Sequence, residues 1–473
     1  MPRGLALAAV FLLAGCAGIP GPEGRAALSG APPAAQSLPA GTGQWPGEDW
    51  WRGGDAQLAG LIEEGLAHSP DLAVAGARMQ KAAAMARVAG AAGLPSLDLR
   101  GNVGEQRQSL NMGYPAAFTA FLPHGWNDTG QVAASLGYDL DLWGRNRSSA
   151  AAARADAAAA AIDARAARLA LATSIAGAYA DLSGLLAVAQ VRQAEVENRA
   201  ALLRLVSDRA AAGMENQAAV RSAEAQLANA RGDLAAARAG VELRRHQLGV
   251  LLGAGPDRAA NVVPTPGEPG APLPADAATG LLARRGDIAA ARLRVEAAAA
   301  RVRVARADFF PSLRLDALIG FQAVGIGNLL QSASTYGNAG PALTLPLFHG
   351  GARIGQYRGA QADFEAARAD YERTVLGAYQ QAADAVSNRA ALKVQRAEAH
   401  AAEAASAEAF RLARERYRAG LSSYLDVLAV EERWLMARLG MASLDAAARG
   451  ADISLIRALG GGYAAAGAEG PKE

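Results

Sequence analysis

Few residues in this chain could do chemistry, and one of them stands in a recognisable setting. Cys16 is the single cysteine, and it follows Arg3, an apolar run and the small residues Ala14 and Gly15. A positive start, a short apolar core and small residues before a cleavage site are typical of an export signal. The pattern predicts that Cys16 begins the mature chain and carries a covalent lipid. The alternative is an ordinary signal peptide with an incidental cysteine.

No group of residues in the sequence indicates catalysis. A lone cysteine excludes an intramolecular disulfide and thiol-pair redox chemistry. The glycine run at 460–462 lies in a polar tail and follows no predicted strand, so it does not predict a phosphate-binding loop. Five histidines are scattered without the spacing of metal ligands: His68, His124, His246, His349 and His400. We therefore predict no catalytic residues, no metal site and no enzymatic activity.

The composition favours long packed helices over a globular core. Alanine is abundant, whereas aromatic residues make up 5% and charged residues 19% of the 473 positions. Small side chains let helices approach closely, but a globular core usually needs larger ones. The formal net charge of +2 is too small to indicate a nucleic-acid partner, and we expect none.

The chain repeats itself. Residues 71–99 match residues 287–315 without a gap, and 15 of the 29 positions are identical at an offset of 216. The shared positions include Pro95-Ser96-Leu97, which recurs as Pro311-Ser312-Leu313. Self-similarity at a fixed offset indicates two tandem copies of one structural plan.

Each copy begins with a predicted helix, over residues 69–93 and 286–309, which ends before the proline of the shared motif. Apolar and polar residues then alternate, as expected for strands with two different faces. The predicted strands span residues 97–103, 132–142, 313–322 and 342–347. Strands with one apolar face suit a transmembrane barrel, with Trp143, Phe309, Phe310 and Phe348 at the membrane interface. A soluble sandwich is the alternative.

A very long helix follows each strand pair. Residues 148–212 and 352–419 contain no proline, and at 1.5 Å per residue about 65 residues span roughly 100 Å. Both stretches end at a glycine, Gly213 or Gly420, which allows the left-handed turn that reverses a helix. Return helices are predicted over 215–252 and 422–459.

The second return helix has apolar residues at alternating steps of four and three, the spacing of a coiled-coil seam. The predicted seam comprises Leu421, Leu425, Leu428, Glu432, Leu435, Leu439, Ala442 and Ala446. Glu432 is unusual in such a seam. We expect it either to pair with an arginine of a neighbouring helix or to be exposed.

The predicted organisation is therefore linear. Proline-rich stretches form an N-terminal tether and separate the two copies. The predicted segments are a lipoprotein signal peptide (1–15), a lipid-anchored tether (16–50), the first repeat (51–253), a linker (254–276), the second repeat (277–460) and a tail (461–473). Four strands cannot close a barrel, and an open sheet edge in lipid leaves backbone groups without partners. Strands that span a membrane thus require an oligomer.

These features together resemble the outer-membrane efflux protein family, the TolC-like channels, and in particular their lipid-anchored NodT-type members. The resemblance covers nearly the whole mature chain. It is carried by the setting of Cys16 and by five short motifs: Trp143-Gly144-Arg145, Phe309-Phe310-Pro311-Ser312-Leu313, Leu347-Phe348 with Gly350-Gly351, Arg416-Tyr417-Arg418-Ala419-Gly420, and Tyr424-Leu425.

The resemblance implies an α+β membrane protein that forms a homotrimer, with a 12-stranded barrel in the outer membrane and a helical barrel in the periplasm. Each chain supplies two repeats of two barrel strands and long coiled-coil helices. The channel would conduct passively. An inner-membrane pump of the resistance-nodulation-division class would supply energy through a periplasmic adaptor, also called a membrane fusion protein. The adaptor would dock at Gly213, Met214, Gly420 and Leu421.

The family's periplasmic gate implies roles for Tyr417, Arg418, Leu425, Asp426 and Glu432. Relatives carry Leu-Asp-Ala-Gln-Arg where this chain has Leu428-Ala429-Val430-Glu431-Glu432, so the usual gate aspartate falls on Ala429. We predict that Asp426 supplies the acidic ring instead, because three carboxylates around a narrow axis favour cations. A solvated surface aspartate is the alternative.

Two other functions share some of these features. A periplasmic adaptor lipoprotein would also have an anchor and helical hairpins, but it should contain one hairpin and a compact soluble β-domain. A channel of a type I protein secretion system would share the whole architecture. The anchor and the resemblance favour small-molecule efflux, with the protein in the outer membrane, in contact with its lipid, and extending into the periplasm.

Overall fold

The computed structural model describes residues 28, 30–34, 36–110, 113, 115–265 and 273–463. The chain forms two compact units. The strand unit contains residues 79–160 and 291–370, and the helix unit contains residues 29–78, 161–290 and 371–473. Cys16 lies outside the described residues.

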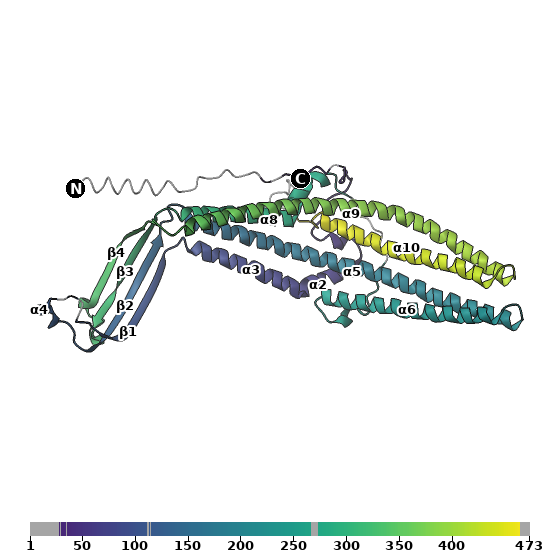
Figure 1. Ribbon diagram of the computed structural model, residues 1–473, viewed down its shortest axis with the longest axis horizontal. Helices are drawn as coiled ribbons and strands as arrows, with labels where there is room; N and C mark the ends of the chain where they lie inside the picture. Colours follow the sequence, from purple (N-terminus) through teal and green to yellow (C-terminus); the bar gives the residue numbers. More distant parts are fainter. Residues whose placement is uncertain are drawn as a thin grey trace. The chain divides into compact units, whose positions relative to one another are not determined.

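The strand unit contains one antiparallel sheet in the order β1-β2-β3-β4 (Figure 1). The strands are β1 (Ser96–Arg107), β2 (Trp126–Asp139), β3 (Ser312–Val324) and β4 (Thr335–Thr344). Each repeat contributes one neighbouring pair, which confirms the predicted two-strand repeats. A short helix, α4 (Ala116–Thr119), lies in the β1–β2 connection, and two 3-10 turns, η4 (Ile326–Asn328) and η5 (Ser332–Ser334), lie between β3 and β4.

The last strand differs from its prediction. β4 begins seven residues before the expected start at 342 and ends three residues before the expected end at 347. Its Pro341 pairs with Leu315 of β3. Proline lacks an N–H to donate, and an edge strand tolerates it because only one side of the strand must be paired. β2 also ends earlier than predicted, because Asp141 (φ 45°) and Gly144 (φ 74°) turn the chain.

Aromatic residues connect the ends of the two repeats in the strand unit. Trp143 stacks on Phe310 with ring centroids 4.5 Å apart, and its Nε1 donates a 2.7 Å hydrogen bond to the Pro311 carbonyl. Arg145 Nε lies 2.7 Å from Asp308 Oδ1. These contacts place the Trp143-Gly144-Arg145 motif directly beside the Phe309-Phe310-Pro311 motif. Their place at a membrane interface stays a prediction.

Two helical hairpins contain the four longest helices of the described residues. The first comprises α5 (Arg145–Ala211) and α6 (Gln217–Leu251), and the second comprises α9 (Ala352–Arg418) and α10 (Tyr424–Ala458). Two further helices, α3 (Pro70–Ala91) and α8 (Gly286–Ala307), precede the first strand of each repeat. All six helices lie within three residues of their predicted limits at each end.

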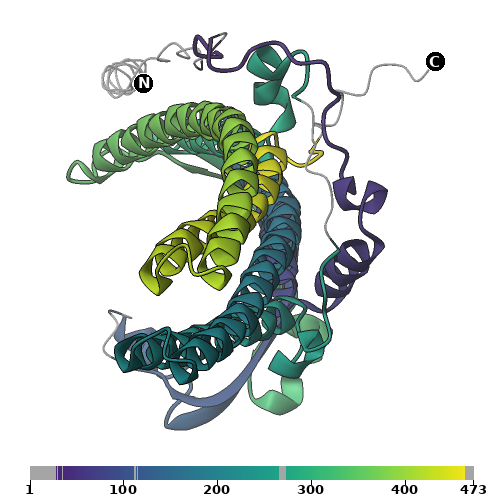
Figure 2. The same cartoon turned by 90° about the vertical axis from the view of Figure 1, so that its right-hand side faces the viewer.

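Within the helix unit, the four hairpin helices lie in the row α6, α5, α10, α9 (Figure 2). The hairpins meet where α5 lies against α10. Arg449 Nη2 donates a 3.0 Å hydrogen bond to Ser183 Oγ, and a Cβ added to Gly184 would lie 2.5 Å from the Ala446 Cβ. Glycine is therefore needed at position 184 for this close approach. The second half of the predicted seam, which includes Ala446, does face a neighbouring helix.

The first half of the predicted seam is wrong. Leu421 and Leu425 are exposed, whereas Tyr424, Val427 and Glu431 are buried. The buried face of α10 is thus rotated by about one residue from the predicted one, because it packs beside both α9 and α5. Phe410 of α9 stacks on Trp434 with ring centroids 4.9 Å apart.

Several short elements pack on the helix unit. The helices α2 (Ala56–His68) and α7 (Ala277–Arg284), and the 3-10 turns η2 (Trp50–Gly53) and η3 (Pro256–Ala259), were not predicted. Buried residues of η2, α2 and η3 join a core with α5 and α6: Trp51, Ile62, Ile175, Leu182, Leu248 and Ala259. Residues of the predicted tether and linker also pack here, since Leu38 is buried and Trp45 Nε1 donates to Asp276 Oδ1 at 2.7 Å.

Many of the apolar residues of α5 belong to this core. One window of the helix is long and apolar enough to cross a membrane, but 56% of that window is buried inside the structure. Its apolar side chains therefore serve helix packing, and the sheet of the strand unit carries the exposed apolar residues that suit lipid, such as Leu97, Leu99 and Val103.

Candidate gate at the two helical turns

One turn joins the two helices of each hairpin, and the turns of the two hairpins match. Gly213 has a φ of 73° and Gly420 a φ of 76°. The Met214 N–H donates to the Arg209 carbonyl at 2.9 Å, and the Leu421 N–H donates to the Arg416 carbonyl at 2.8 Å. This bond closes a six-residue Schellman turn, which satisfies carbonyls left free at the end of a helix. The predicted glycine turns are present in both hairpins.

Side-chain caps begin both return helices. Asn216 Oδ1 accepts from the Ala219 N–H at 2.9 Å. In α10, Ser423 and Asp426 form a reciprocal capping box, in which Asp426 Oδ2 accepts from the Ser423 N–H at 2.9 Å. These hydrogen bonds, with a smaller contribution from Arg416, lower the pKa of Asp426. Asp426 is exposed and ionised, and it has a structural role at this turn. The acidic ring stays a prediction.

Tyr417 links the two hairpins. Its side chain is fully buried, and its hydroxyl donates a 3.1 Å hydrogen bond to Glu215 Oε2 in the turn of the first hairpin. The Arg209 guanidinium lies 4.8 Å from the centre of the Tyr417 ring and donates to the Tyr417 carbonyl at 3.1 Å. Burial, together with the negative charge of Glu215, raises the pKa of Tyr417 to about 12. The hydroxyl is therefore a protonated donor at every physiological pH.

The other predicted gate and docking residues lie on the surface near the same turns. Arg418 and Glu432 are exposed. Leu425, Leu421 and Met214 are exposed apolar residues. The structure brings Tyr417 together with Arg209 and Glu215, and it leaves these five side chains exposed.

The sequence analysis did not predict a buried ionic cluster between α5 and α10. Glu431 is only 2% exposed, and its Oε2 has no hydrogen-bond partner among the described residues. Arg199 and Glu195 of α5 are also buried, with Arg199 Nε 3.2 Å from Glu195 Oε1. Burial raises the pKa of Glu431, and the nearby Arg199 opposes this shift. The seam spacing placed the unusual carboxylate at Glu432. The buried one is its neighbour.

Other groups around this cluster are paired. Arg192 Nη1 lies 2.8 Å from Glu195 Oε2 and 3.1 Å from Asp233 Oδ2 on α6, and Arg199 Nη1 donates to Gln226 Oε1 at 2.8 Å. The cluster therefore ties α5 to α6 by an ion pair and a hydrogen bond, and to α10 by the attraction between Arg199 and Glu431. Among the described residues, no group of three or more histidine, cysteine or carboxylate side chains could hold a metal ion.

Comparison with known proteins agrees with this architecture. A family model described as "Outer membrane efflux protein" matches residues 61–254 and 278–461. The fusaric acid resistance protein FusA of Burkholderia cepacia is 34% identical over 374 residues, which are 75% of this chain and 68% of FusA. The multidrug resistance outer membrane protein MdtP of Shigella flexneri is 30% identical over 432 residues, 89% of this chain and 88% of MdtP.

Solved structures share the fold. The crystal structure of the outer membrane protein VceC from Vibrio cholerae is 38% identical, with a TM-score of 0.82 over 88% of this chain and 100% of VceC. The outer-membrane channel OprN is 27% identical, with a TM-score of 0.85 over 94% of this chain and 99% of OprN. The chain therefore belongs to the outer membrane efflux protein family, and it is a non-enzymatic outer-membrane channel of an efflux system that extends into the periplasm.

Proposed function

We propose that this protein is a homotrimeric exit duct through which small molecules leave a tripartite efflux pump. The observation that carries the trimer is the sheet of the strand unit. Its four strands leave β1 and β4 as open edges, and all of β1 is exposed. An open edge cannot stay in lipid, because its N–H and C=O groups would lack partners. Three copies supply twelve strands, a number that closes a barrel.

Light scattering of the detergent-extracted protein, corrected for bound detergent, tests the trimer. We expect a stable species of three times the 48.3 kDa chain mass, less the signal peptide. A monodisperse monomer would contradict the proposal, because four strands alone cannot close.

We propose small molecules as cargo because FusA and MdtP, two relatives matched over most of this chain, are named for resistance to fusaric acid and to multiple drugs. Deleting the gene should raise accumulation of a pump substrate in cells, and the wild-type gene should restore efflux. If deletion instead abolished release of a secreted protein and left drug accumulation unchanged, the type I secretion function would replace this one.

A lipid on Cys16 would anchor the mature chain to the outer membrane. The support is the sequence around Cys16, which lies outside the described residues. Mass spectrometry of the mature N-terminal peptide should show a lipid-modified cysteine, and a Cys16→Ser variant should lack it. An unmodified Cys16 in the wild-type protein would contradict the anchor.

The two turns would dock a periplasmic adaptor, which connects the channel to a resistance-nodulation-division pump in the inner membrane. Exposed Met214 and Leu421, each directly after a turn glycine, support this role. Replacing both with glutamate should abolish co-purification of the cognate adaptor and leave the trimer intact. A Val263→Glu variant, which also changes an exposed apolar residue but lies after η3 and outside both turns, is the control.

Tyr417, Arg418, Leu425, Asp426 and Glu432 would form the periplasmic gate. Tyr417 supports this role by tying the second hairpin to Glu215 of the first. Disrupting that link should favour the open state. In planar bilayers, Tyr417→Ala channels should conduct more than wild type. Equal conductance would remove Tyr417 from the gate.

A further inference from the structure

The joint between the hairpins, where α5 lies against α10, changes character along its length. Near the turns it is apolar, and its buried cluster includes Leu202, Val206, Tyr424 and Val427. At the next positions on the same faces, at steps of three or four residues, α5 carries Arg199 and Glu195, and α10 carries Glu431. The joint is therefore apolar near the turns and ionic about one helical turn behind them.

Glu431 is the member of this ionic group that lacks a hydrogen-bond partner. Its side chain is only 2% exposed, and no described residue bonds to its Oε2. The nearby Arg199 donates instead to Glu195 Oε1 at 3.2 Å and to Gln226 Oε1 at 2.8 Å. An ionised Glu431 in this joint is thus a buried carboxylate beside a second carboxylate, and the attraction of Arg199 offsets only part of that cost.

The titratable groups of α10 itself do not relieve this burial. Glu432, the next residue, adds a further negative charge, which opposes ionisation of Glu431. Burial raises the pKa of Tyr424, so its hydroxyl stays neutral and supplies no positive charge. The neutral carboxyl of Glu431 is therefore the form that suits the packed joint.

The charged side chains of α9 beside this part of α10 interact with aromatic rings. The Arg414 guanidinium lies 5.8 Å from the centre of the Phe410 ring. Phe410 stacks on Trp434, and Glu403 accepts from Trp434 Nε1 at 3.3 Å. Neither charged group of α9 donates to Glu431.

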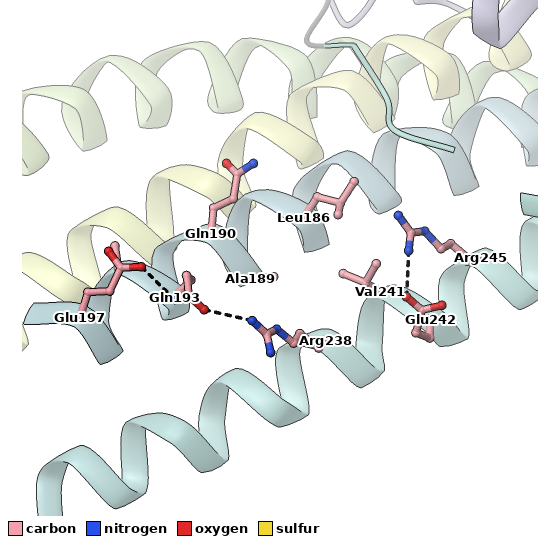
Figure 3. Close-up of a pocket in the computed structure, with 10 residues that line it drawn as sticks. Leu186, Ala189, Gln190, Gln193, Glu197, Arg238, Val241, Glu242 and Arg245 are labelled. Carbon is pink, nitrogen blue, oxygen red and sulfur yellow. Dashed lines mark hydrogen bonds and ion pairs between the residues drawn. The ribbon is translucent and has the colours of Figure 1, made fainter. Parts of the chain in front are cut away.

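The carboxylates that line the groove between α5 and α6 are paired. This groove has a volume of about 440 Å³ (Figure 3). In it, Gln193 Nε2 donates to Glu197 Oε1 at 2.8 Å, and Arg238 Nη2 donates to Gln193 Oε1 at 3.0 Å. Glu242 accepts from Arg245 Nη1 at 2.8 Å. Both carboxylates are exposed and have donors, so they differ from Glu431 in the two respects that make its charge unfavourable.

The equivalent position of the first hairpin differs in the same way. The helices α6 and α10 each contain 35 residues and begin at residues 217 and 424, which are 207 positions apart. The counterpart of Glu431 is therefore Glu224, which is exposed and lies 2.7 Å from Arg221 Nη1. The two copies thus hold the same side chain, and only the second copy buries it between hairpins.

We propose that Glu431 is a proton-controlled latch on the periplasmic gate: its protonated carboxyl keeps α10 packed against α5, and its ionisation loosens this contact and favours the open gate. This inference rests on the proposed gate and adds the group that controls it. Separation of the hairpins admits water to the carboxylate, so the open joint favours the ionised form. The closed joint is therefore most stable at low pH and loses stability as the pH rises, by at most about tenfold per pH unit for one proton.

Amide hydrogen exchange tests the latch within the joint. Peptides that cover residues 195–206 of α5 have the same sequence in wild type and in Glu431→Gln, so intrinsic exchange chemistry cancels in the ratio of their rates. Glutamine keeps the shape of the side chain but is neutral at every pH. The ratio of wild type to variant should increase from pH 5 to pH 8, by at most about tenfold per pH unit. Glu432→Gln, the matched control, removes the same charge from the exposed neighbour and should follow wild type.

Planar-bilayer recordings test the effect on the gate. The open probability of wild type and of Glu432→Gln should increase from pH 5 to pH 8 more than that of Glu431→Gln. Exposed acidic groups such as Asp426 are present in all three proteins, so their titration does not affect the comparison. Glu431→Asp alters the packing but keeps a titratable group, and it should retain a pH dependence that Glu431→Gln has lost.

A constant exchange ratio, or equal pH profiles of wild type and Glu431→Gln in bilayers, would overturn the latch. The same holds if Glu432→Gln loses the pH dependence as Glu431→Gln does, or if Glu431→Asp loses it too. If the protein is nevertheless a trimer that conducts, the proposed function survives. A wild-type monomer in light scattering, or no conductance at any pH in wild type and Tyr417→Ala alike, would overturn the proposed function.

Discussion

Removing one hydroxyl group should loosen the turn of the first hairpin. In Tyr417→Phe, Glu215 loses its 3.1 Å hydrogen bond, while the ring keeps its contact with the Arg209 guanidinium. A hydrogen bond to a charged group contributes about 1.5–3 kcal/mol. Glu215 is half-buried and gains water when the bond is lost, so we expect the lower end of this range. About 1.5 kcal/mol corresponds to roughly a tenfold change in local opening.

Amide hydrogen exchange measured by mass spectrometry detects this change. Peptides that cover residues 209–219 should exchange about tenfold faster in Tyr417→Phe. Tyr417→Ala also removes a buried ring, worth about 3–5 kcal/mol, and should exchange more than a hundredfold faster. Tyr379→Phe is the matched control, because it removes a hydroxyl that donates at 2.8 Å to the Ala278 carbonyl at another site.

The pH dependence follows from the raised pKa. The fold favours the neutral Tyr417 hydroxyl, so its contribution is fully present below the ordinary pKa of 10 and is lost as the pH rises through about 12. The difference between wild type and Tyr417→Phe should therefore be constant from pH 6 to pH 9. If residues 209–219 of Tyr417→Phe exchanged at the wild-type rate, while the Tyr379→Phe control exchanged faster near its own site, the stabilising role of the Tyr417–Glu215 hydrogen bond would be refuted.

Four other changes test neighbouring features. Burial raises the pKa of Glu431, so the fold favours the neutral carboxyl and loses stability as the pH rises and the carboxyl ionises. Glutamine is neutral at every pH, so Glu431→Gln should raise the unfolding temperature more at pH 8 than at pH 5. Gly184→Val should destabilise the α5–α10 joint by about 1–3 kcal/mol, and Ala446→Gly should partly restore it in thermal unfolding. Ser423→Ala should cost about 1 kcal/mol in denaturant unfolding by removing a cap. Asp426→Asn should reduce cation selectivity in bilayers, and unchanged selectivity would leave Asp426 with the capping role alone.

Local sequence signals predicted the framework of this protein. Helix limits depend on prolines, caps and turn glycines that lie within a few residues of each helix end. The predicted limits of the six long helices therefore agree with the structure to within three residues. The four strands were also expected, because alternation along a strand does not depend on distant residues. The duplication at a fixed offset further predicted that strand pairs and hairpins would each occur twice.

The less regular elements gave weaker signals. β4 was placed too late, and only the sheet shows that β4 is an edge, where Pro341 is tolerated. The short helices α2 and α7 were missed. α7 has only eight residues, too few for a clear apolar period, whereas α2 has 13 residues and a side-chain cap at Asp55 that could have indicated it. They are held by burial of residues such as Ile62 and Leu281 against the rest of the helix unit.

The sequence by itself determined that this chain builds two copies of one hairpin and one strand pair, since these follow from period, length and repetition. Only the tertiary structure decided which side chains of the hairpins meet. Neighbouring helix positions differ by about 100° in direction, so Glu431 is buried and Glu432 exposed although either satisfied the seam spacing approximately. Likewise, Tyr417 contacts Glu215 across some two hundred residues, because the packing of the hairpins sets that distance and no local pattern encodes it.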